Sequence, residues 1–380
     1  FFQAEDGIRE VERSRGLGDV YKRQVRVPRV WPYRRRERFL LADSEVTEEI
    51  FADLISDVSQ YVENNSLEPS YFELLTAAAL LLFSNEGVDA AVVEVGILGR
   101  FDATNVLDGE VAVITNIGKD HTDGKKEWRR AIAAEKAGII VEGKPLLLGH
   151  SEEDVLDLFL AENPEPLFQN GKDFLVEESI SAVGGQVISV RGIFGRYQEI
   201  FLPLYGKRQA ENAALALASA ETFLEGSVPE DAIEDAFANL SVPGRLEILS
   251  RRPIVLVDGA HNRDSAKHLA ETVNEVFPAN RRILILGILE PHSPEEIFAE
   301  LKDISPELVV VCDAPSPRAI DVHVLEDIAL KLGFEVAIAE NPYEATLHAL
   351  RISDEEDLIV IAGSFYNVSE CRRAVSDTNS

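Results

Sequence analysis

The spacing of apolar residues predicts that amphipathic helices alternate with buried strands along the chain. Apolar residues recur at helical spacing over residues 46–64, with Thr47 placed to cap that helix, and residues 71–84 are apolar on nearly every side. Two short runs, 90–95 and 111–114, are rich in β-branched residues and end in polar residues and glycines. Such runs are typical of doubly buried parallel strands, so we expect their carboxyl ends to bring polar groups to one edge of a sheet.

The middle of the chain predicts further α/β elements and one change of pattern. A helix is expected over 127–138, a strand over 145–149 and a helix over 152–161. Three short apolar runs separated by glycines then predict a small antiparallel sheet, with strands at 174–176, 186–190 and 199–202. Two helices follow, at 207–225 and 229–240.

Beyond residue 253 the pattern becomes a regular succession of strand and helix. Strands are expected at 254–258, 283–287, 308–312, 335–339 and 358–362, each followed by a helix. Repeated units of this kind predict a mostly parallel sheet with right-handed crossovers. We therefore expect an α/β protein whose second domain, Rossmann-like but without the glycine fingerprint of dinucleotide binding, begins near Pro243-Gly244.

Composition and charge narrow the function classes. The 380 residues carry a net charge of −30, but residues 1–38 hold 11 basic and 6 acidic residues, so the rest of the chain is at −35. An acidic body of this kind argues against nucleic acid as a partner and fits either a saline habitat or a well-solvated surface. No apolar run is long enough to span a membrane. Cys312 and Cys371 are expected to be reduced thiols, which makes a cytoplasmic enzyme the default interpretation.

The amino-terminal residues do not fit the rest of the chain. Residues 1–24 show neither helical nor strand periodicity and resemble translated sequencing-adapter read-through, so we exclude them from the fold. The alternative is a basic arm that binds an acidic partner. Residues 25–38 are rich in arginine and are expected to be a solvated surface segment, and the sequence contains no methionine.

Three residues in the stretch 92–140 indicate metal and phosphate chemistry. Glu94 lies near the end of the first predicted strand, His121 follows the second, and Lys136 lies near the end of the next helix. A carboxylate with a supporting imidazole suits a divalent cation bound to phosphate. The alternatives are a solvated carboxylate, a structural histidine and a lysine that forms a salt bridge with Glu135.

Six motifs in order carry a resemblance to a known family. They are VEVGILGRFDATN at 93–105, ITNIGKDHT at 114–122, EKAGI at 135–139, PGRLE at 243–247, DGAHN at 258–262 and GSFY at 363–366. Together they resemble folylpolyglutamate synthases of the Mur ligase superfamily, which join glutamate to folates and in part also make dihydrofolate from dihydropteroate. The resemblance implies a Mur-ligase-type ATP-binding domain over 25–243, with a parallel and a small antiparallel sheet, and a glutamate-ligase domain over 244–380.

The resemblance also implies roles for named residues. Glu94 and His121 would ligate Mg²⁺, and Lys136 would carry a carbamate, which makes Lys136 and His121 the catalytic candidates. Phe101, Asp102 and Ala103 would lie against the pterin-bearing substrate. For the nucleotide, the resemblance implies contacts from Asn212 to adenine, from Arg245 to phosphate and from Asp258 to ribose. The alternative for Asp102 is a turn-forming residue, and for the nucleotide set it is helix caps or surface ion pairs.

The expected activity is ATP-driven ligation of L-glutamate to a folate through an acyl phosphate, by a monomer with small-molecule substrates. The family's phosphate loop, a TNGKGS-like segment, is absent, and residues 27–30 lack the family's SPH serine. We therefore expect an amino-terminally truncated chain that is inactive or nearly so. The alternatives are a Mur-type ligase for another substrate and a catalytically dead homologue that still binds folate or nucleotide.

Overall fold

The computed structural model describes residues 24–27, 39–41, 44–118, 127–150, 152–238 and 240–378. The chain divides into two compact units. The first comprises residues up to Gly109 together with Ala134–Ile139, and the second comprises Glu110–Ala133 and Ile140 onward. Helix α3 (Trp128–Ala137) contributes to both, and each unit has its own core.

The first unit packs two helices against a small sheet. Helix α1 (Glu48–Asn64) begins after Thr47, whose side chain accepts the Ile50 amide, and α2 (Tyr71–Glu86) begins with a capping box from Ser70. The sheet has the strand order β3-β2-β1-β4, that is Ser44–Glu45, Leu40–Leu41, Gln24–Val27 and Ala90–Val93. The buried faces of α1 and α2 form one cluster with Phe39 and Val46.

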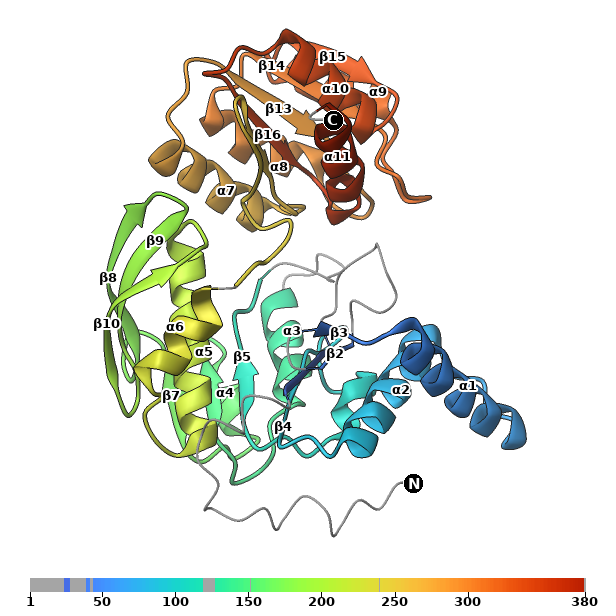
Figure 1. Ribbon diagram of the computed structural model, residues 1–380, viewed down its shortest axis with the longest axis vertical. Helices are drawn as coiled ribbons and strands as arrows, with labels where there is room; N and C mark the ends of the chain where they lie inside the picture. The colour runs from blue at the N-terminus through green and yellow to red at the C-terminus, as the bar shows by residue number, and fades with distance from the viewer. Residues whose placement is uncertain are drawn as a thin grey trace. The chain divides into compact units, whose positions relative to one another are not determined.

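The second unit begins with two small sheets (Figure 1). Strands β5 (Ala112–Ile114), β6 (Leu146–Leu148) and β7 (Leu167–Gln169) are parallel. Strands β8 (Leu175–Ala182), β9 (Gly185–Arg191) and β10 (Arg196–Leu202) are antiparallel. Helix α5 (Lys207–Leu224) buries its alanine-rich face in the core that these sheets share, and α6 (Glu230–Ala238) packs on β10. Helix α4 (Leu156–Leu160) lies between β6 and β7 in the chain.

The carboxyl-terminal part of the second unit is a six-stranded sheet with the order β11-β12-β16-β13-β14-β15. The antiparallel edge strand β11 (Glu247–Arg251) precedes five parallel strands, which are β12 (Ile254–Val257), β13 (Arg282–Leu286), β14 (Leu308–Cys312), β15 (Val336–Ala339) and β16 (Leu358–Ala362). Five helices connect or follow them, namely α7 (Arg263–Val276), α8 (Pro294–Leu301), α9 (Val322–Lys331), α10 (Pro342–Ile352) and α11 (Phe365–Thr378).

The helices of this sheet divide between its two faces (Figure 1). One face packs on α7, α8 and α9, through every second residue of the strands, such as Leu284 and Leu286. The opposite face packs on α10 and α11. Because both faces are covered, strands such as β14 and β16 are buried at every position, which explains their continuous apolar sequence.

The predicted α/β class with parallel, small antiparallel and carboxyl-terminal sheets is confirmed, but several elements differ from the expectation. Strands β4 and β5 lie in separate sheets, and Val92 in β4 is 55% exposed rather than doubly buried, because β4 is an edge strand among the described residues. Gln24, excluded from the fold, and residues 25–27, expected in a solvated segment, instead form β1, which pairs with β2 and with β4. The pattern also missed the strands β7 and β11. In the described part of the chain, no helix is both long and apolar enough to cross a bilayer.

Candidate functional site

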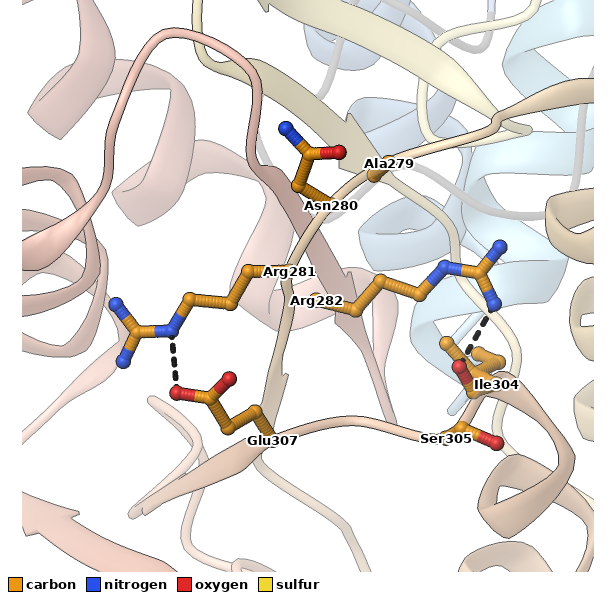
Figure 2. A pocket seen from close by; sticks show the side chains of 7 residues that line it. All are labelled: Ala279, Asn280, Arg281, Arg282, Ile304, Ser305 and Glu307. Atoms are coloured by element: carbon orange, nitrogen blue, oxygen red, sulfur yellow. Dashed lines mark hydrogen bonds and ion pairs between the residues drawn. The ribbon is translucent and has the colours of Figure 1, made fainter.

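The two edges of the carboxyl-terminal sheet differ in what they offer a ligand. At the amino ends of β13 and β14 lies a cavity of about 260 Å³ lined by Arg281 and Arg282 (Figure 2). Arg281 pairs with Glu307 at 2.9 Å, and Arg282 donates to the Ile304 carbonyl at 2.8 Å. Both arginines therefore stabilise this end of the sheet, Arg281 through its ion pair with Glu307 and Arg282 through its hydrogen bond to the backbone. Sites in parallel α/β sheets form at the carboxyl ends of the strands, which is the opposite edge.

At the carboxyl edge, Asp258 directly follows β12 and is 9% exposed. Its Oδ2 accepts the Leu246 amide at 2.9 Å and its Oδ1 accepts the Ala260 amide at 2.8 Å. Burial raises the pKa of Asp258 above its ordinary value, and the positive charge of Arg245 and these two hydrogen bonds oppose that shift. Asp258 thus joins two loops of this edge, and its contact with a ribose stays a prediction.

Arg245 lies in the tight turn that precedes β11. Its guanidinium stacks on the Phe365 ring, with Cζ 4.5 Å from the ring centroid. Gly244 and Leu246 on either side adopt left-handed backbone conformations, with φ of +70° and +46°. The structure therefore brings together Arg245 and Asp258, the two predicted nucleotide contacts of this region, with the first residue of α11.

Two histidines that the sequence left without a role lie at the same edge. His261 and His292 have ring centroids 4.8 Å apart. The Nδ1 of His261 lies 2.7 Å from the Gly259 carbonyl, so it carries the proton and the Nε2 atom faces away from that bond. Asn262 caps α7 by accepting the Ser265 amide. The edge thus gathers a guanidinium, an aromatic ring and two imidazoles, a set suited to an anionic ligand.

In the first unit, Glu94 follows β4 directly and is exposed. Lys136 is half-buried in the last turn of α3. Of the predicted metal and catalytic residues, His121 lies outside the described residues. Within the ranges that the structure describes, no three His, Cys, Asp or Glu side chains gather closely enough to hold a metal ion. The Mg²⁺ site and the Lys136 carbamate therefore stay predictions.

The loop after β4 is held against the end of α3 by backbone contacts. The Arg100 amide donates to the Glu135 carbonyl at 2.8 Å, and the Arg100 guanidinium donates to the Ala134 carbonyl at 3.1 Å. A methyl group at Gly138 would lie 2.5 Å from Arg100 Cα, and one at Gly99 would lie 2.8 Å from the Glu135 carbonyl oxygen. The GR and EKAG motifs thus need their glycines because the two segments touch.

The predicted substrate residues of this loop divide into an exposed and a structural part. Phe101 is 87% exposed, and Ala103 begins a short 3₁₀-helix, η3 (Ala103–Val106). Asp102 caps that helix by accepting the Thr104 amide at 3.0 Å, and it accepts the Ile97 amide at 2.8 Å. Burial acts to raise the pKa of Asp102, but the hydrogen bonds from Thr104, Ile97 and Gly96 outweigh it and hold the pKa below its ordinary value.

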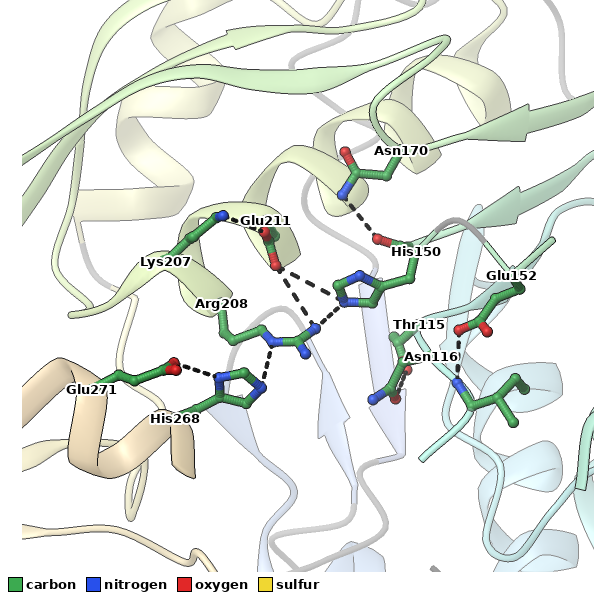
Figure 3. A network of polar contacts seen from close by, with 12 residues as sticks. Thr115, Asn116, His150, Glu152, Asn170, Lys207, Arg208, Glu211, His268 and Glu271 are labelled. Atoms are coloured by element: carbon green, nitrogen blue, oxygen red, sulfur yellow. Dashed lines mark hydrogen bonds and ion pairs between the residues drawn. The ribbon is translucent and has the colours of Figure 1, made fainter. Parts of the chain in front are cut away.

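Asn212, predicted to meet adenine, lies exposed on α5, one residue from a polar network that sequence reasoning missed (Figure 3). In that network Arg208 of α5 donates to Nε2 of His150 and, at 3.0 Å, to Nε2 of His268 in α7. Burial and the Arg208 charge lower the pKa of His150, so the ring is a neutral acceptor. Glu211 lies 3.8 Å from Arg208. The only signal for this cluster was the position of His150 just after a strand.

Comparison with known proteins identifies the family. The Mur ligase middle domain matches residues 46–220, and the Mur ligase, glutamate ligase domain matches residues 244–365. The dihydrofolate synthase/folylpolyglutamate synthase of Mycobacterium tuberculosis is 40% identical over 269 residues, which cover 67% of this chain but only 55% of the relative. The Escherichia coli protein of the same name is 32% identical, covering 80% of this chain and 69% of the relative.

Comparison with solved structures identifies the same family. The solved structure of Mycobacterium tuberculosis folylpolyglutamate synthase complexed with ADP matches with a TM-score of 0.88 at 33% identity, covering 94% of this chain and 85% of that one. The order of the six motifs, the two domain matches and the structural agreement are mutually consistent. The chain belongs to the folylpolyglutamate synthase/dihydrofolate synthase family of Mur ligases.

Proposed function

We propose that the protein to which this chain belongs ligates L-glutamate to a folate with the energy of ATP, and the assay below includes dihydropteroate as a second acceptor. The observation that carries the proposal is the carboxyl-edge cluster, in which Arg245 stacks on Phe365 beside Asp258. A relative that shares this fold was solved with ADP, which is the nucleotide product of such a ligation. The domain boundaries that fit this function are 25–243 for ATP binding and 244–380 for glutamate ligation.

The proposed reaction has two steps. An oxygen of the folate carboxylate attacks the γ-phosphorus of ATP, ADP leaves, and an acyl phosphate forms. The amine of L-glutamate then attacks the acyl carbon, the amide bond forms, and inorganic phosphate leaves with the bonding electron pair while the amine loses a proton. Arg245 would neutralise phosphate charge through its guanidinium, which lies on the Phe365 ring and near Asp258.

Residues outside the carboxyl-terminal sheet would supply the metal, folate and adenine contacts. A carboxylate at the end of β4 suits a hard cation, so Glu94 would hold Mg²⁺ together with His121. When bound, Mg²⁺ would neutralise charge on the phosphates. The half-buried position of Lys136 suits a carbamate, which would add an anionic oxygen to that site. The exposed ring of Phe101, together with Asp102 and Ala103, would face the pterin, and Asn212 on α5 would meet adenine.

We further propose that the 380-residue polypeptide itself turns over slowly or not at all. Its sequence contains no glycine-rich loop followed by Lys-Ser or Lys-Thr, and such a loop supplies the backbone amides, the lysine and the hydroxyl that hold the phosphates and Mg²⁺. The same observation supports a second candidate, a homologue that binds folate or nucleotide without ligating. We expect a cytoplasmic enzyme that acts on small-molecule substrates as a monomer.

The test is an assay of glutamate ligation. The purified chain is incubated with ATP, Mg²⁺, L-glutamate and either tetrahydrofolate or dihydropteroate, and mass spectrometry measures glutamylated product while a coupled assay measures ADP. A matched chain with a TNGKGS-like loop placed before residue 25 is run beside it. Product from the restored chain alone supports both proposals. If neither chain gives product but folate still binds in a titration, the binding homologue is supported. Normal turnover by the 380-residue chain without the added loop contradicts the proposed inactivity.

A further inference from the structure

The turn that carries Arg245 is strained and yet well connected. Leu246 holds φ at +46° although it has a side chain, a conformation that favours glycine. Its side chain is buried in the core of the carboxyl-terminal sheet, which stabilises that conformation. Its amide donates to Asp258, and the Gly244 carbonyl accepts the Gly259 amide at 2.7 Å. The backbone on either side of Arg245 is thus fixed to the DGAHN loop.

A second set of contacts fixes the same turn from the other side. The Gly244 amide donates to Oε2 of Glu247 at 2.7 Å. Both carboxylate oxygens of Glu247 in turn accept Nη2 of Arg372, at 2.8 and 2.9 Å. Glu247 is 25% exposed and Arg372 is 43% exposed, so this pair is partly shielded from water. Glu247 therefore connects the turn to a residue 125 positions later in the chain.

Helix α11 presents one face to the turn. Phe365 and Arg372 are seven residues apart, which is close to two helical turns, so they lie on the same side of α11. Val368 lies between them, and a methyl group at Gly244 would lie 3.1 Å from Phe365 and 3.2 Å from Val368. The helix therefore contacts the turn at three successive levels, with Phe365 beneath the Arg245 guanidinium and Arg372 at Glu247.

From these contacts we infer that Glu247 and Arg372 are positioning residues, which hold the turn so that the Arg245 guanidinium stays on Phe365 and faces the phosphate of a nucleoside diphosphate. The inference rests on the proposed function for the phosphate role of Arg245. The backbone part of the inference is independent of it, since the hydrogen bonds that hold the turn are internal to this chain. Arg372 touches no ligand in this assignment and acts through Glu247.

The backbone part is tested by amide hydrogen exchange of the folded chain, read from the peptide that contains Gly244 and Leu246. With Arg372→Leu we expect exchange in this peptide to become about tenfold faster, because a charge-assisted hydrogen bond is lost. Arg372→Lys should restore part of the protection, as a point charge without the guanidinium fork. Arg373→Leu is the control, because Arg373 pairs with Glu370 and stacks on Tyr343. Equal exchange in Arg372→Leu and Arg373→Leu overturns the inference.

The ligand part is tested by titrating ADP into the same variants and following amide shifts by NMR in the millimolar range. Arg372→Leu should weaken ADP binding about tenfold, by the same lost contact, and Arg245→Ala should weaken it at least as much. In the Arg245→Ala background, Arg372→Leu should have no further effect. If Arg245→Ala leaves the affinity unchanged, the phosphate role in the proposed function is wrong. If Arg245→Ala weakens ADP and Arg372→Leu does not, the positioning inference alone is wrong.

Discussion

The loop after β4 and the turn before β11 carry the two clearest motifs of the chain, and they are held in different ways. In the loop, glycines let the backbone at Arg100 touch the end of α3, and Phe101 is left exposed. In the turn, the buried or half-buried carboxylates of Asp258 and Glu247 hold the backbone. The first motif is therefore sensitive to added volume, and the second is sensitive to lost hydrogen bonds.

The largest effect should come from adding volume where the end of α3 meets the loop. Gly138→Ala would place a methyl group 2.5 Å from Arg100 Cα. The clash is with backbone, so relieving it requires one of the two segments to move. We expect the free energy of unfolding to fall by about 3 kcal/mol. Urea unfolding followed by tryptophan fluorescence measures it. Gly226→Ala is the control, since its nearest neighbour would be 4.0 Å away. Equal stabilities of the two variants would contradict the close packing of the loop.

A smaller effect should follow from removing one acceptor in the carboxyl-edge cluster. Asp258→Asn replaces one carboxylate oxygen, which is an acceptor, with an NH₂ group, which is a donor. The backbone N–H of either Leu246 or Ala260 then faces a second donor and loses its hydrogen bond. We expect a loss of about 2 kcal/mol, because a buried backbone N–H would lose its partner. Asp235→Asn on the exposed side of α6 is the matched control and should change stability by less than about 0.5 kcal/mol. Chemical denaturation of both variants compares them, and a stable Asp258→Asn would mean that another acceptor replaces it.

The carboxyls of the two regions should also respond oppositely to pH. The pKa of Asp102 is lowered, so its stabilising contribution is present near neutral pH and is lost below about pH 4. The pKa of Asp258 is raised, so its contribution is greatest in acid and falls as the pH rises through its folded-state pKa. Asp102→Ala should cost about 1 kcal/mol at pH 7 through the lost cap and less in acid.

The measurement is stability against pH for Asp102→Ala, Asp258→Asn and the control Asp108→Ala, whose carboxylate is exposed. The first variant should flatten the acid limb of the profile. The second should remove a slope of the opposite sign. If both variants change the profile in the same direction, one of the two pKa shifts has the wrong sign.

Much of the fold followed from apolar periodicity, because the cores impose it. The strands of the carboxyl-terminal sheet are buried on both faces and read as continuous apolar runs, as β14 and β16 do. Strand β4 reads the same way, yet it is an edge strand with Val92 exposed among the described residues. An apolar run indicates which residues of a strand are expected to be buried. It does not indicate which sheet the strand joins or whether it lies at the edge.

The candidate site was predictable where the side chains of a motif make the contacts that hold it in place. PGRLE and DGAHN lie together because their own side chains, Glu247 and Asp258, hydrogen-bond the backbone of the turn. Arg372 was not predictable, because its partner lies in a different motif far along the chain and nothing local marks it. The Arg208 network was missed for the same reason, since its members come from α5, α7 and the segment after β6.

The smallest effect on stability should come from Phe101, and this variant separates folding from binding in the loop. The ring is 87% exposed, so Phe101→Ala should change the free energy of unfolding by less than about 0.5 kcal/mol. If the ring packs on a pterin, the same change should weaken folate binding about tenfold, because the apolar surface that the ligand covers is removed. Titration calorimetry with folate measures this. Val106→Ala, 73% exposed on the same loop, should leave the affinity unchanged. An unchanged affinity in Phe101→Ala would show that the exposed ring is not the folate contact. A stability loss above about 1 kcal/mol in the same variant would instead contradict the exposure of the ring.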